Sequence, residues 1–182
     1  MSYCNKKITT EVSIDYPLYQ SKKGNYFIGQ TPILTGETKH ALAALINPSK
    51  SNRNIYLNAI TITNISAINL FAEFYLRSNF SNGVTSKLVS CTNTTISPEP
   101  VHKGKIKYLT KATEPPNDGV SIFSRIVSSN STLVVDGGQI ILGPEESIIV
   151  YIGGFLPVAF DNVRFAFGWW EEEDLNCHNH SC

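Results

Sequence analysis

The chain has 182 residues, a formal net charge of zero and 42% hydrophobic residues, which suffices for one domain with a sizeable core and excludes wholesale disorder. Residues 1–111 hold 13 lysines and arginines against 5 acidic residues, whereas residues 112–182 hold 2 against 10. The sequence has no dense basic stripe with interleaved aromatics, so nucleic-acid binding is not expected. The opposite charges of the two halves could steer association between copies, or cancel if the fold interleaves them.

The N-terminal region lacks the basic residues and following apolar run that mark a signal peptide. No apolar segment approaches the roughly 20 residues needed to span a bilayer. We therefore expect a protein that is made in the cytosol without a signal peptide and does not insert into a membrane. Residues 1–20 are polar and carry Cys4, and we expect them to form a flexible N-terminal arm.

The apolar segments between residues 21 and 171 are short and mostly have a period of two, as expected for strands with one buried face. In the two longest of them, the residues expected on the buried face are Leu70, Ala72, Phe74 and Leu76, and then Val163, Phe165, Phe167 and Trp169. Residues 147–152 form a β-branched run, which is also typical of a strand. Residues 40–46 could instead be helical, but they are too few for the pattern to decide.

Turn-forming residues separate these segments at strand-length intervals. Residues 136–138 (Asp-Gly-Gly) predict a hairpin between the segments on either side, because Asp and Gly tolerate positive φ. Residues 143–146 (Gly-Pro-Glu-Glu) predict the turn into the next strand. A run of about eight such strands predicts one all-β domain over residues 21–171, an antiparallel β-sandwich of jelly-roll type.

No motif in the sequence points to catalysis or to a cofactor. There is no Gly-rich phosphate loop, no Gly-x-Ser-x-Gly elbow and no His-Glu-x-x-His sequence. No histidine has a partner at a spacing that indicates a general base. We therefore expect a protein that is not an enzyme and needs no cofactor.

Residues 172–182 form an acidic tail that ends with Cys177, His178, His180 and Cys182. Thiols and imidazoles are ligands that zinc and copper favour. Their spacing, however, differs from that of a structural zinc site, where a folded loop separates two ligand pairs. A tail with cross-linking cysteines is therefore favoured over a metal site.

Trp169 and Trp170 precede four acidic residues at 171–174. Exposed aromatic rings would suit stacking on a sugar, but neighbouring side chains on a strand point to opposite faces. Trp169 continues the buried row, whereas Trp170 is expected to be exposed or buried at a subunit contact, where tryptophan often anchors an interface. Trp170 is therefore an interface candidate, and the acidic run is expected to be a solvated strand exit.

Residues 102–111 alternate basic and apolar side chains. On an edge strand, Lys103, Lys105 and Lys107 would prevent uncontrolled pairing of that edge. Alternatively, these lysines would make a salt-sensitive contact with residues 171–174 of a neighbouring copy. They are therefore interface candidates beside Trp170.

Three of the four cysteines, Cys4, Cys177 and Cys182, lie near the ends of the chain, and Cys91 lies in a Ser/Thr/Asn-rich stretch. Chain ends are exposed, and thiol exchange requires exposure. This placement favours disulfides between copies. Two alternatives stay open: pairing within the chain, for which four cysteines allow three complete connectivities, and four reduced thiols.

The polar arm with Cys4, the strand-rich body and the lack of a signal peptide resemble the jelly-roll subunits of bacterial endospore appendages. Residues 143–147 (GPEES) and 165–171 (FAFGWWE) also resemble segments of small uncharacterised proteins from spore-forming Firmicutes. The resemblance implies that Cys4 reaches another subunit and forms a disulfide there, with Cys91 as a possible acceptor. It also implies assembly in the mother cell and oxidation after lysis. This chain differs in having a single arm cysteine and a C-terminal Cys/His tail.

The resulting hypothesis is a self-assembling structural subunit of a spore or cell surface, linked to its own copies by disulfides from Cys4 to Cys91, Cys177 or Cys182. The first alternative is a jelly-roll module that binds a glycan or a receptor without covalent assembly. The second alternative is a surface protein that binds metal through its tail.

Overall fold

The computed structural model describes residues 13–36, 40–109, 112, 114–153 and 159–174, and these residues are almost entirely β. The elements are α1 (Tyr16–Lys22), β1 (Tyr26–Gln30), β2 (Leu34–Gly36), β3 (Ala41–Ile46), β4 (Arg53–Asn64), β5 (Leu70–Leu76), β6 (Val84–Thr85), β7 (Val89–Cys91), β8 (Lys105–Leu109), β9 (Val120–Val127), β10 (Ser131–Asp136), β11 (Ile141–Leu142), β12 (Ser147–Ile152) and β13 (Phe160–Glu173).

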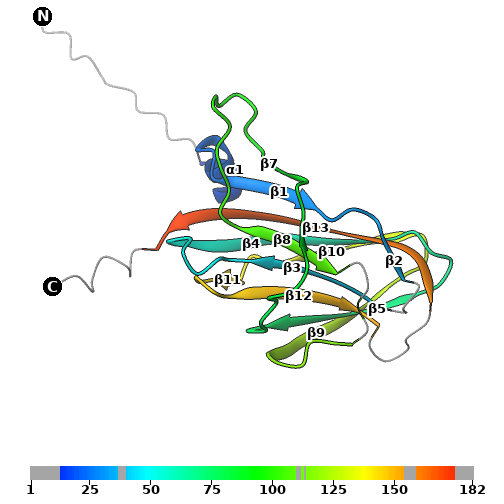
Figure 1. Cartoon of the computed structure of the whole chain (residues 1–182). Coiled ribbons are helices and arrows are strands. Elements are labelled where there is room, and N and C mark those ends of the chain that lie inside the picture. The colour runs from blue at the N-terminus through cyan, green and yellow to red at the C-terminus, as the bar shows by residue number, and fades with distance from the viewer. Residues whose placement is uncertain (1–12, 37–39, 110–111, 113, 154–158, 175–182) are drawn as a thin grey trace, which may run out of the picture.

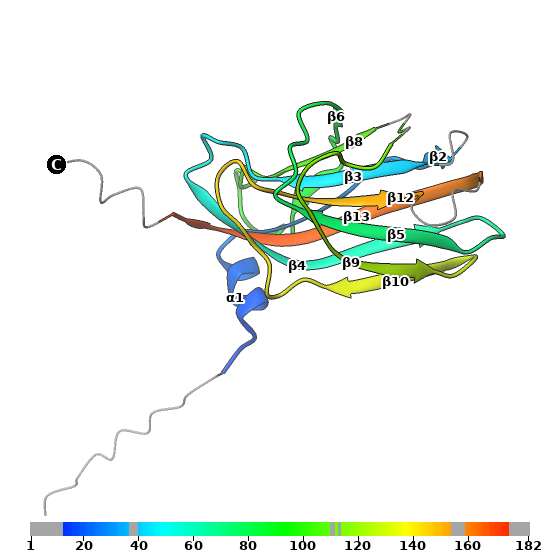
Figure 2. The ribbon, with the colours of Figure 1, turned by 90° about the horizontal axis from the view of Figure 1, so that it is seen from below.

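The strands form two antiparallel sheets that pack face to face (Figure 1, Figure 2). Sheet A has the order β10-β4-β13-β1-β7, with β11 also paired to β4 and β2 to β13. Sheet B has the order β6-β8-β3-β12-β5-β9. The predicted antiparallel β-sandwich is therefore confirmed.

The strand order is that of a jelly roll. When β1, β3, β4, β5, β9, β10, β12 and β13 are numbered one to eight along the chain, sheet A reads 1-8-3-6 and sheet B reads 2-7-4-5. The remaining strands β6, β7 and β8 belong to a long insertion between β5 and β9. This insertion closes one edge of the sandwich, because β7 pairs with β1 and β8 pairs with β3.

The core lies between the two sheets and contains the residues that the period of two predicts. Phe165, Phe167 and Trp169 of β13 are buried, as are Ala72 and Phe74 of β5. Side chains of this size each stabilise the fold by about 1.5–3 kcal/mol when they are fully buried. The alternation in these two segments is therefore confirmed.

Residues 41–46, within the segment that could have been helical, form strand β3. Its first five residues are all buried. One side of β3 faces the main core, and Leu42 and Ala44 on the other side pack with Ile149 and Tyr151 in a second apolar cluster. A strand covered on both sides reads as a continuous apolar run, which is why its periodicity could not separate strand from helix.

The predicted hairpin at residues 136–138 is wrong. Strands β10 and β11 both pair with β4, one after the other, and not with each other. A Cβ on Gly137 would lie 2.6 Å from the Leu57 side chain, so this glycine allows a close approach to β4 and not a positive φ. The turn at residues 143–146 is confirmed, since the Glu146 N–H donates to the Gly143 carbonyl and Glu145 has a φ of 72°.

Both boundaries of the sandwich differ from the predicted ones, residues 21 and 171. Helix α1 begins at Tyr16, inside the expected arm, and packs on β1 and β13. Strand β13 continues to Glu173, two residues beyond the expected end. The remainder of the expected arm to residue 12, and the tail from residue 175, lie outside the described residues.

Candidate assembly surfaces

The edge of the sandwich formed by β9 and β10 is open. These strands have eight and six residues, end their respective sheets, and lie side by side (Figure 2). The exposed side chains include Ile126 of β9, at 63%, and Val134 of β10. Strand β9 contains no lysine or proline, and the Arg125 guanidinium lies 4.7 Å from the Phe123 ring centre. The edge is not bare, because exposed Arg125 lies opposite the core residue Ala72 and a β-bulge interrupts the pairing of β9 with β5 between Phe123 and Ser121. Its length and its exposed apolar side chains still leave N–H and C=O groups with which another strand could pair.

The opposite edge is closed by short strands and by side-chain hydrogen bonds. Strands β7 and β6, which end the two sheets there, have three and two residues. The Ser86 hydroxyl donates to the Gln30 carbonyl at 2.6 Å, and the Gln30 N–H donates to the Leu88 carbonyl at 2.9 Å. Short edge strands of this kind offer little backbone for pairing.

The three lysine candidates lie along this closed edge. Lys105 and Lys107 are on β8, which pairs with β3 on one side and with the two residues of β6 on the other. Lys107 Nζ donates to the Ser81 carbonyl at 3.1 Å, whereas Lys105 is exposed. Lys103 is in the preceding loop and donates its backbone N–H to Glu171. Strand β8 is therefore only partly an edge, and the longer edge strands are on the far side.

The expectation that Trp170 is exposed or buried at a subunit contact is wrong, because its own chain covers it. Trp170 is 8% exposed. Its ring lies parallel to that of Tyr56 at 5.3 Å between centres, and Tyr16 of α1 meets it edge-on at 5.8 Å. Helix α1 therefore takes the place that a neighbouring copy would have filled. Sequence reasoning missed this because residues 16–20, most of α1, were assigned to the flexible arm.

The prediction that the acidic run is a solvated strand exit is wrong for Glu171, whereas the Glu173 side chain is 70% exposed. The Glu171 carboxylate is buried, at 3% exposure, and accepts hydrogen bonds from the backbone N–H groups of Lys103 and Gly104 at 2.9 and 2.8 Å and from Trp169 Nε1 at 3.0 Å. A contact of Glu171 with lysines of a neighbouring copy is therefore not available. Glu173 lies 3.7 Å from the Arg53 guanidinium.

Glu172 holds α1 on the sheet. Its Oε1 accepts hydrogen bonds from the Tyr16 hydroxyl and from Gln20 Nε2, both at 2.7 Å, and from Trp170 Nε1 at 3.1 Å. The hydrogen bond to this carboxylate raises the pKa of Tyr16, because it favours the protonated phenol. The last turn of α1 is held as well, since the Ser21 and Thr92 hydroxyls lie 2.7 Å apart.

Cys91 is buried at the closed edge, at 4% exposure. It pairs with Phe27 across β1 and β7, and its Sγ donates to the Gly24 carbonyl at 3.6 Å. Because thiol exchange needs access to the sulfur, Cys91 is a poor acceptor in the folded subunit. Cys4, Cys177 and Cys182 lie outside the described residues.

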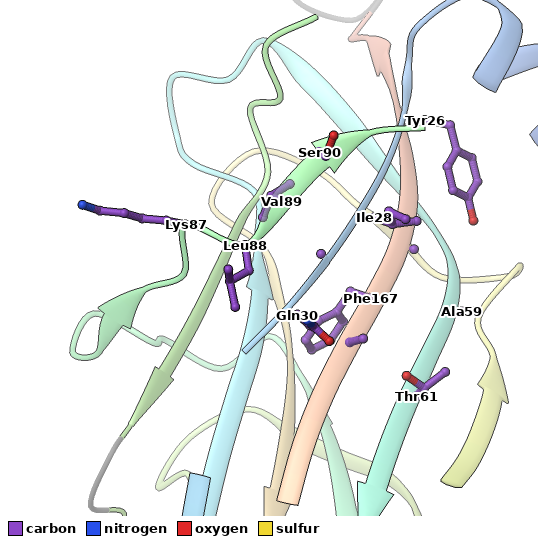
Figure 3. Close-up of a pocket in the computed structure, with 13 residues that line it drawn as sticks. Tyr26, Ile28, Gln30, Ala59, Thr61, Lys87, Leu88, Val89, Ser90 and Phe167 are labelled. Carbon is purple, nitrogen blue, oxygen red and sulfur yellow. The ribbon is translucent and has the colours of Figure 1, made fainter. Parts of the chain in front are cut away.

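The outer face of sheet A carries a shallow apolar groove of about 570 Å³ between β7, β1, β13 and β4 (Figure 3). Small residues make its floor, and larger side chains from β1 and the β7 region stand beside it. The floor residues are Ala59, Thr61, Ala166 and Gly168, and the larger ones are Tyr26, Ile28 and Leu88. Tyr26 accepts a hydrogen bond from Asn58 Nδ2 at 2.9 Å, and its pKa is raised by burial.

The outer face of sheet B carries a group of polar aromatic residues beside the open edge. The Tyr75 hydroxyl donates to Glu73, and desolvation together with this hydrogen bond raises the pKa of Tyr75 to about 12. Tyr151 stacks on His40 with 5.7 Å between ring centres, and its hydroxyl lies 2.6 Å from His40 Nδ1. Burial also raises the pKa of Tyr151.

Among the described residues, no three His, Cys, Asp or Glu side chains lie close enough together to bind a metal ion. The tail residues that prompted the metal hypothesis fall outside this search. The helix in the described part of the chain is too short to cross a membrane.

The chain belongs to a family of unknown function, DUF6143, whose model matches residues 1–176. No curated protein and no solved structure matches the chain. The resemblance to spore-appendage subunits therefore stays a prediction, and the functional argument has to come from the surfaces described above.

Proposed function

We propose that this DUF6143 member is a self-assembling structural subunit that joins its own copies through the open edge formed by β9 and β10. The observation that carries the proposal is the contrast between the two edges. One edge is closed by the insertion after β5, whereas the other leaves two long strands side by side without a lysine or proline on β9. Proteins that stay monomeric usually protect a long edge, and here Arg125 and one β-bulge are the protective features on β9.

The joining step is the addition of strands. The free N–H and C=O groups of β9 pair with a strand of another copy and extend sheet B, and β10 extends sheet A at the same junction. Ile126 and Val134 add apolar contact area to these backbone hydrogen bonds. Contacts that do not close on themselves would produce a filament, and contacts that close would produce a ring.

Disulfides from the chain ends then lock the assembly. Two thiols, one from each copy, lose two protons and two electrons to dissolved oxygen and form one S–S bond. The cysteines proposed for this step are Cys4, Cys177 and Cys182. Cys91 is left out because it is buried in the core, on β7 beside β1, in the folded subunit. A spore or cell surface, where oxygen is available, is the proposed location of the finished assembly.

The glycan-binding alternative receives no support from the tryptophans that suggested it. Trp169 is in the core and Trp170 lies under α1. Neither ring offers an exposed face on which a sugar could stack. We therefore propose no second function.

The experiment compares Ile126→Lys with Val101→Lys, a matched substitution at an exposed site in the loop before β8. Both variants are oxidised in air and then analysed by non-reducing denaturing gel and electron microscopy. We expect the parent and Val101→Lys to form high-mass species that collapse to the 20.1 kDa chain with reductant, and Ile126→Lys to form far fewer. Cys4→Ser in the parent should leave the assemblies soluble in denaturant.

The outcomes separate the two steps of the proposal. If Ile126→Lys assembles as well as Val101→Lys, the open edge is not the joining surface. If the Cys4→Ser assemblies resist denaturant as well as the parent, the arm cysteine is not the lock. A parent that stays a single band and shows no fibres or rings would overturn the proposed function as a whole.

A further inference from the structure

The chain has three places where an asparagine or aspartate precedes a glycine, at residues 82–83, 118–119 and 136–137. The backbone nitrogen of the glycine can attack the side-chain carbonyl carbon before it, because the two groups are held close together and glycine has no Cβ to obstruct the approach. In a folded protein this reaction depends on whether hydrogen bonds hold the nitrogen or the side chain. The structure treats the three pairs differently.

The two aspartate pairs are protected. The Gly137 N–H donates to the Asn58 carbonyl at 2.8 Å, so the attacking nitrogen of that pair is held. Both carboxylate oxygens of Asp118 accept hydrogen bonds, Oδ1 from the Ser78 hydroxyl at 2.5 Å and Oδ2 from the Asn79 N–H at 3.0 Å. These hydrogen bonds lower the pKa of Asp118 because they favour the ionised form. An ionised carboxylate resists attack by a nucleophile.

The asparagine pair has neither protection. Asn82 and Gly83 are both exposed. In the described part of the chain, neither the Asn82 side chain nor the Gly83 N–H has a hydrogen-bond partner. The attacking nitrogen and the attacked amide are therefore both available in the folded state.

The turn itself requires the glycine. Gly83 has a φ of 122°, and a Cβ there would lie 2.8 Å from the Phe80 ring and 3.0 Å from the Tyr108 carbonyl oxygen. A larger residue at position 83, which would slow the attack, is therefore not accommodated without strain. The reactive pair is built into this turn and faces water.

We infer that Asn82 is a modification site, at which the folded protein converts its own asparagine into aspartate or isoaspartate. The Gly83 nitrogen gives up its proton and bonds to Asn82 Cγ, while the Cγ–Nδ2 bond breaks and Nδ2 leaves as ammonia with a proton. Water then opens the resulting cyclic imide at either of its two carbonyls. One opening gives aspartate, and the other gives isoaspartate, whose backbone runs through the side-chain carbons.

Either product changes the closed edge of the sandwich. It adds one negative charge directly after Ser81, whose carbonyl accepts a hydrogen bond from Lys107 Nζ at 3.1 Å. Isoaspartate also lengthens the backbone just before β6, the strand that ends sheet B at that edge (Figure 2). The open edge of the proposed function is not involved, and the inference does not depend on that function.

The experiment follows all three pairs in the folded full chain, kept in reductant at mildly alkaline pH. Peptide mapping by mass spectrometry reports the change from amide to acid at Asn82, and enzymatic methylation of isoaspartate reports the rearranged product. Synthetic peptides of the same three sequences give the unprotected rates. We expect Asn82 in the folded chain to react within about ten-fold of its peptide, because exposed loops open at little cost. The rate should rise with pH, since the attacking nitrogen must lose its proton.

Two results of this comparison would overturn the inference. One is a stronger suppression at Asn82, since a reaction that required global unfolding would be slowed about a thousand-fold or more. The other is an equal suppression at all three pairs relative to their peptides. Asp118 and Asp136 are expected to be slowed more than Asn82, because of the hydrogen bonds that hold them or the glycine after them.

A pair of variants tests the position. Asn82→Gln keeps the amide but needs a larger ring, so it should acquire no acidic species on isoelectric focusing, with an unchanged unfolding midpoint. Asn117→Gln is the matched control, because Asn117 is also exposed in a loop but precedes an aspartate. It should acquire acidic species as fast as the parent. An Asn82→Gln variant that does so equally fast would place the reaction elsewhere and overturn the inference.

Discussion

The two edges of the sandwich show that one chain can cover the ends of its sheets on one side and leave them open on the other. At the closed edge, the insertion between β5 and β9 adds β7 to sheet A and β8 and β6 to sheet B, and the buried Glu171 carboxylate holds the loop before β8. At the open edge, β9 and β10 end their sheets with exposed apolar side chains. The contrast shows that this fold can accommodate an insertion that covers a sheet edge. The uncovered edge at β9 and β10 is therefore a candidate for function.

The largest effect is expected at the closed edge, from Glu171→Ala. The substitution leaves the backbone N–H groups of Lys103 and Gly104 buried without an acceptor. We expect the free energy of unfolding to fall by about 3 kcal/mol, because removing a charged acceptor from buried donors costs their full desolvation. Urea unfolding followed by tryptophan fluorescence would measure this change.

The matched control for that substitution is Glu173→Ala. Glu173 lies on the same strand but makes a single exposed ion pair with Arg53 at 3.7 Å, so its removal should cost less than about 1 kcal/mol. An equal decrease in the free energy of unfolding for the two variants would mean that Glu171 does not hold the closed edge.

A smaller effect is expected from a pair of glycine substitutions, one at each edge. A Cβ at Gly29 would lie 2.7 and 2.8 Å from the side chains of Val89 and Ile106, so Gly29→Ala should lower the free energy of unfolding by about 2 kcal/mol through overpacking. Gly138, in the loop after β10, has no atom within 4 Å of the same position. Gly138→Ala should therefore be nearly neutral, and thermal unfolding of both variants would test the contrast.

If Gly29→Ala proved as harmless as Gly138→Ala, the contact of β1 with β7 would have to be looser than its geometry implies. The closed edge would then be less tightly packed than the hydrogen bonds of Ser86 and Gln30 suggest. Hydrogen exchange of the Gln30 amide would distinguish local opening from a uniform relaxation.

The sequence predicted the sandwich well because alternation is a local property. The buried rows of β5 and β13 follow directly from a period of two and are confirmed. The pairing around residues 136–138 could not be predicted in this way. Those residues resemble a hairpin turn. Both flanking strands pair instead with β4, about 80 positions earlier in the chain, and the residues of the turn carry no information about such a distant partner.

The candidate surfaces were predicted less well because burial by distant residues is not visible in a sequence. Trp170 was expected at an interface, and only the folded chain shows that Tyr16 covers it. The run at 171–174 was expected in solvent, whereas the loop at 103–104 returns to bind Glu171. The open edge could not be predicted from residues 120–127, because the predicted strands at 70–76 and 147–152 also lack lysine and proline.

The smallest effect is expected beside the open edge, from the titration of Tyr75. Its folded pKa is raised from 10.0 to about 12, first by desolvation and then by the hydrogen bond to Glu73. A raised pKa means that the unfolded chain releases this proton first, so the stabilisation is complete below pH 10 and is lost as the pH rises toward 12. Tyr75→Phe removes the group and should flatten the decline in unfolding midpoint over that range. Tyr19→Phe, a tyrosine on α1 far from this edge, should keep the decline, and an equal flattening in both variants would show that Tyr75 is not its source.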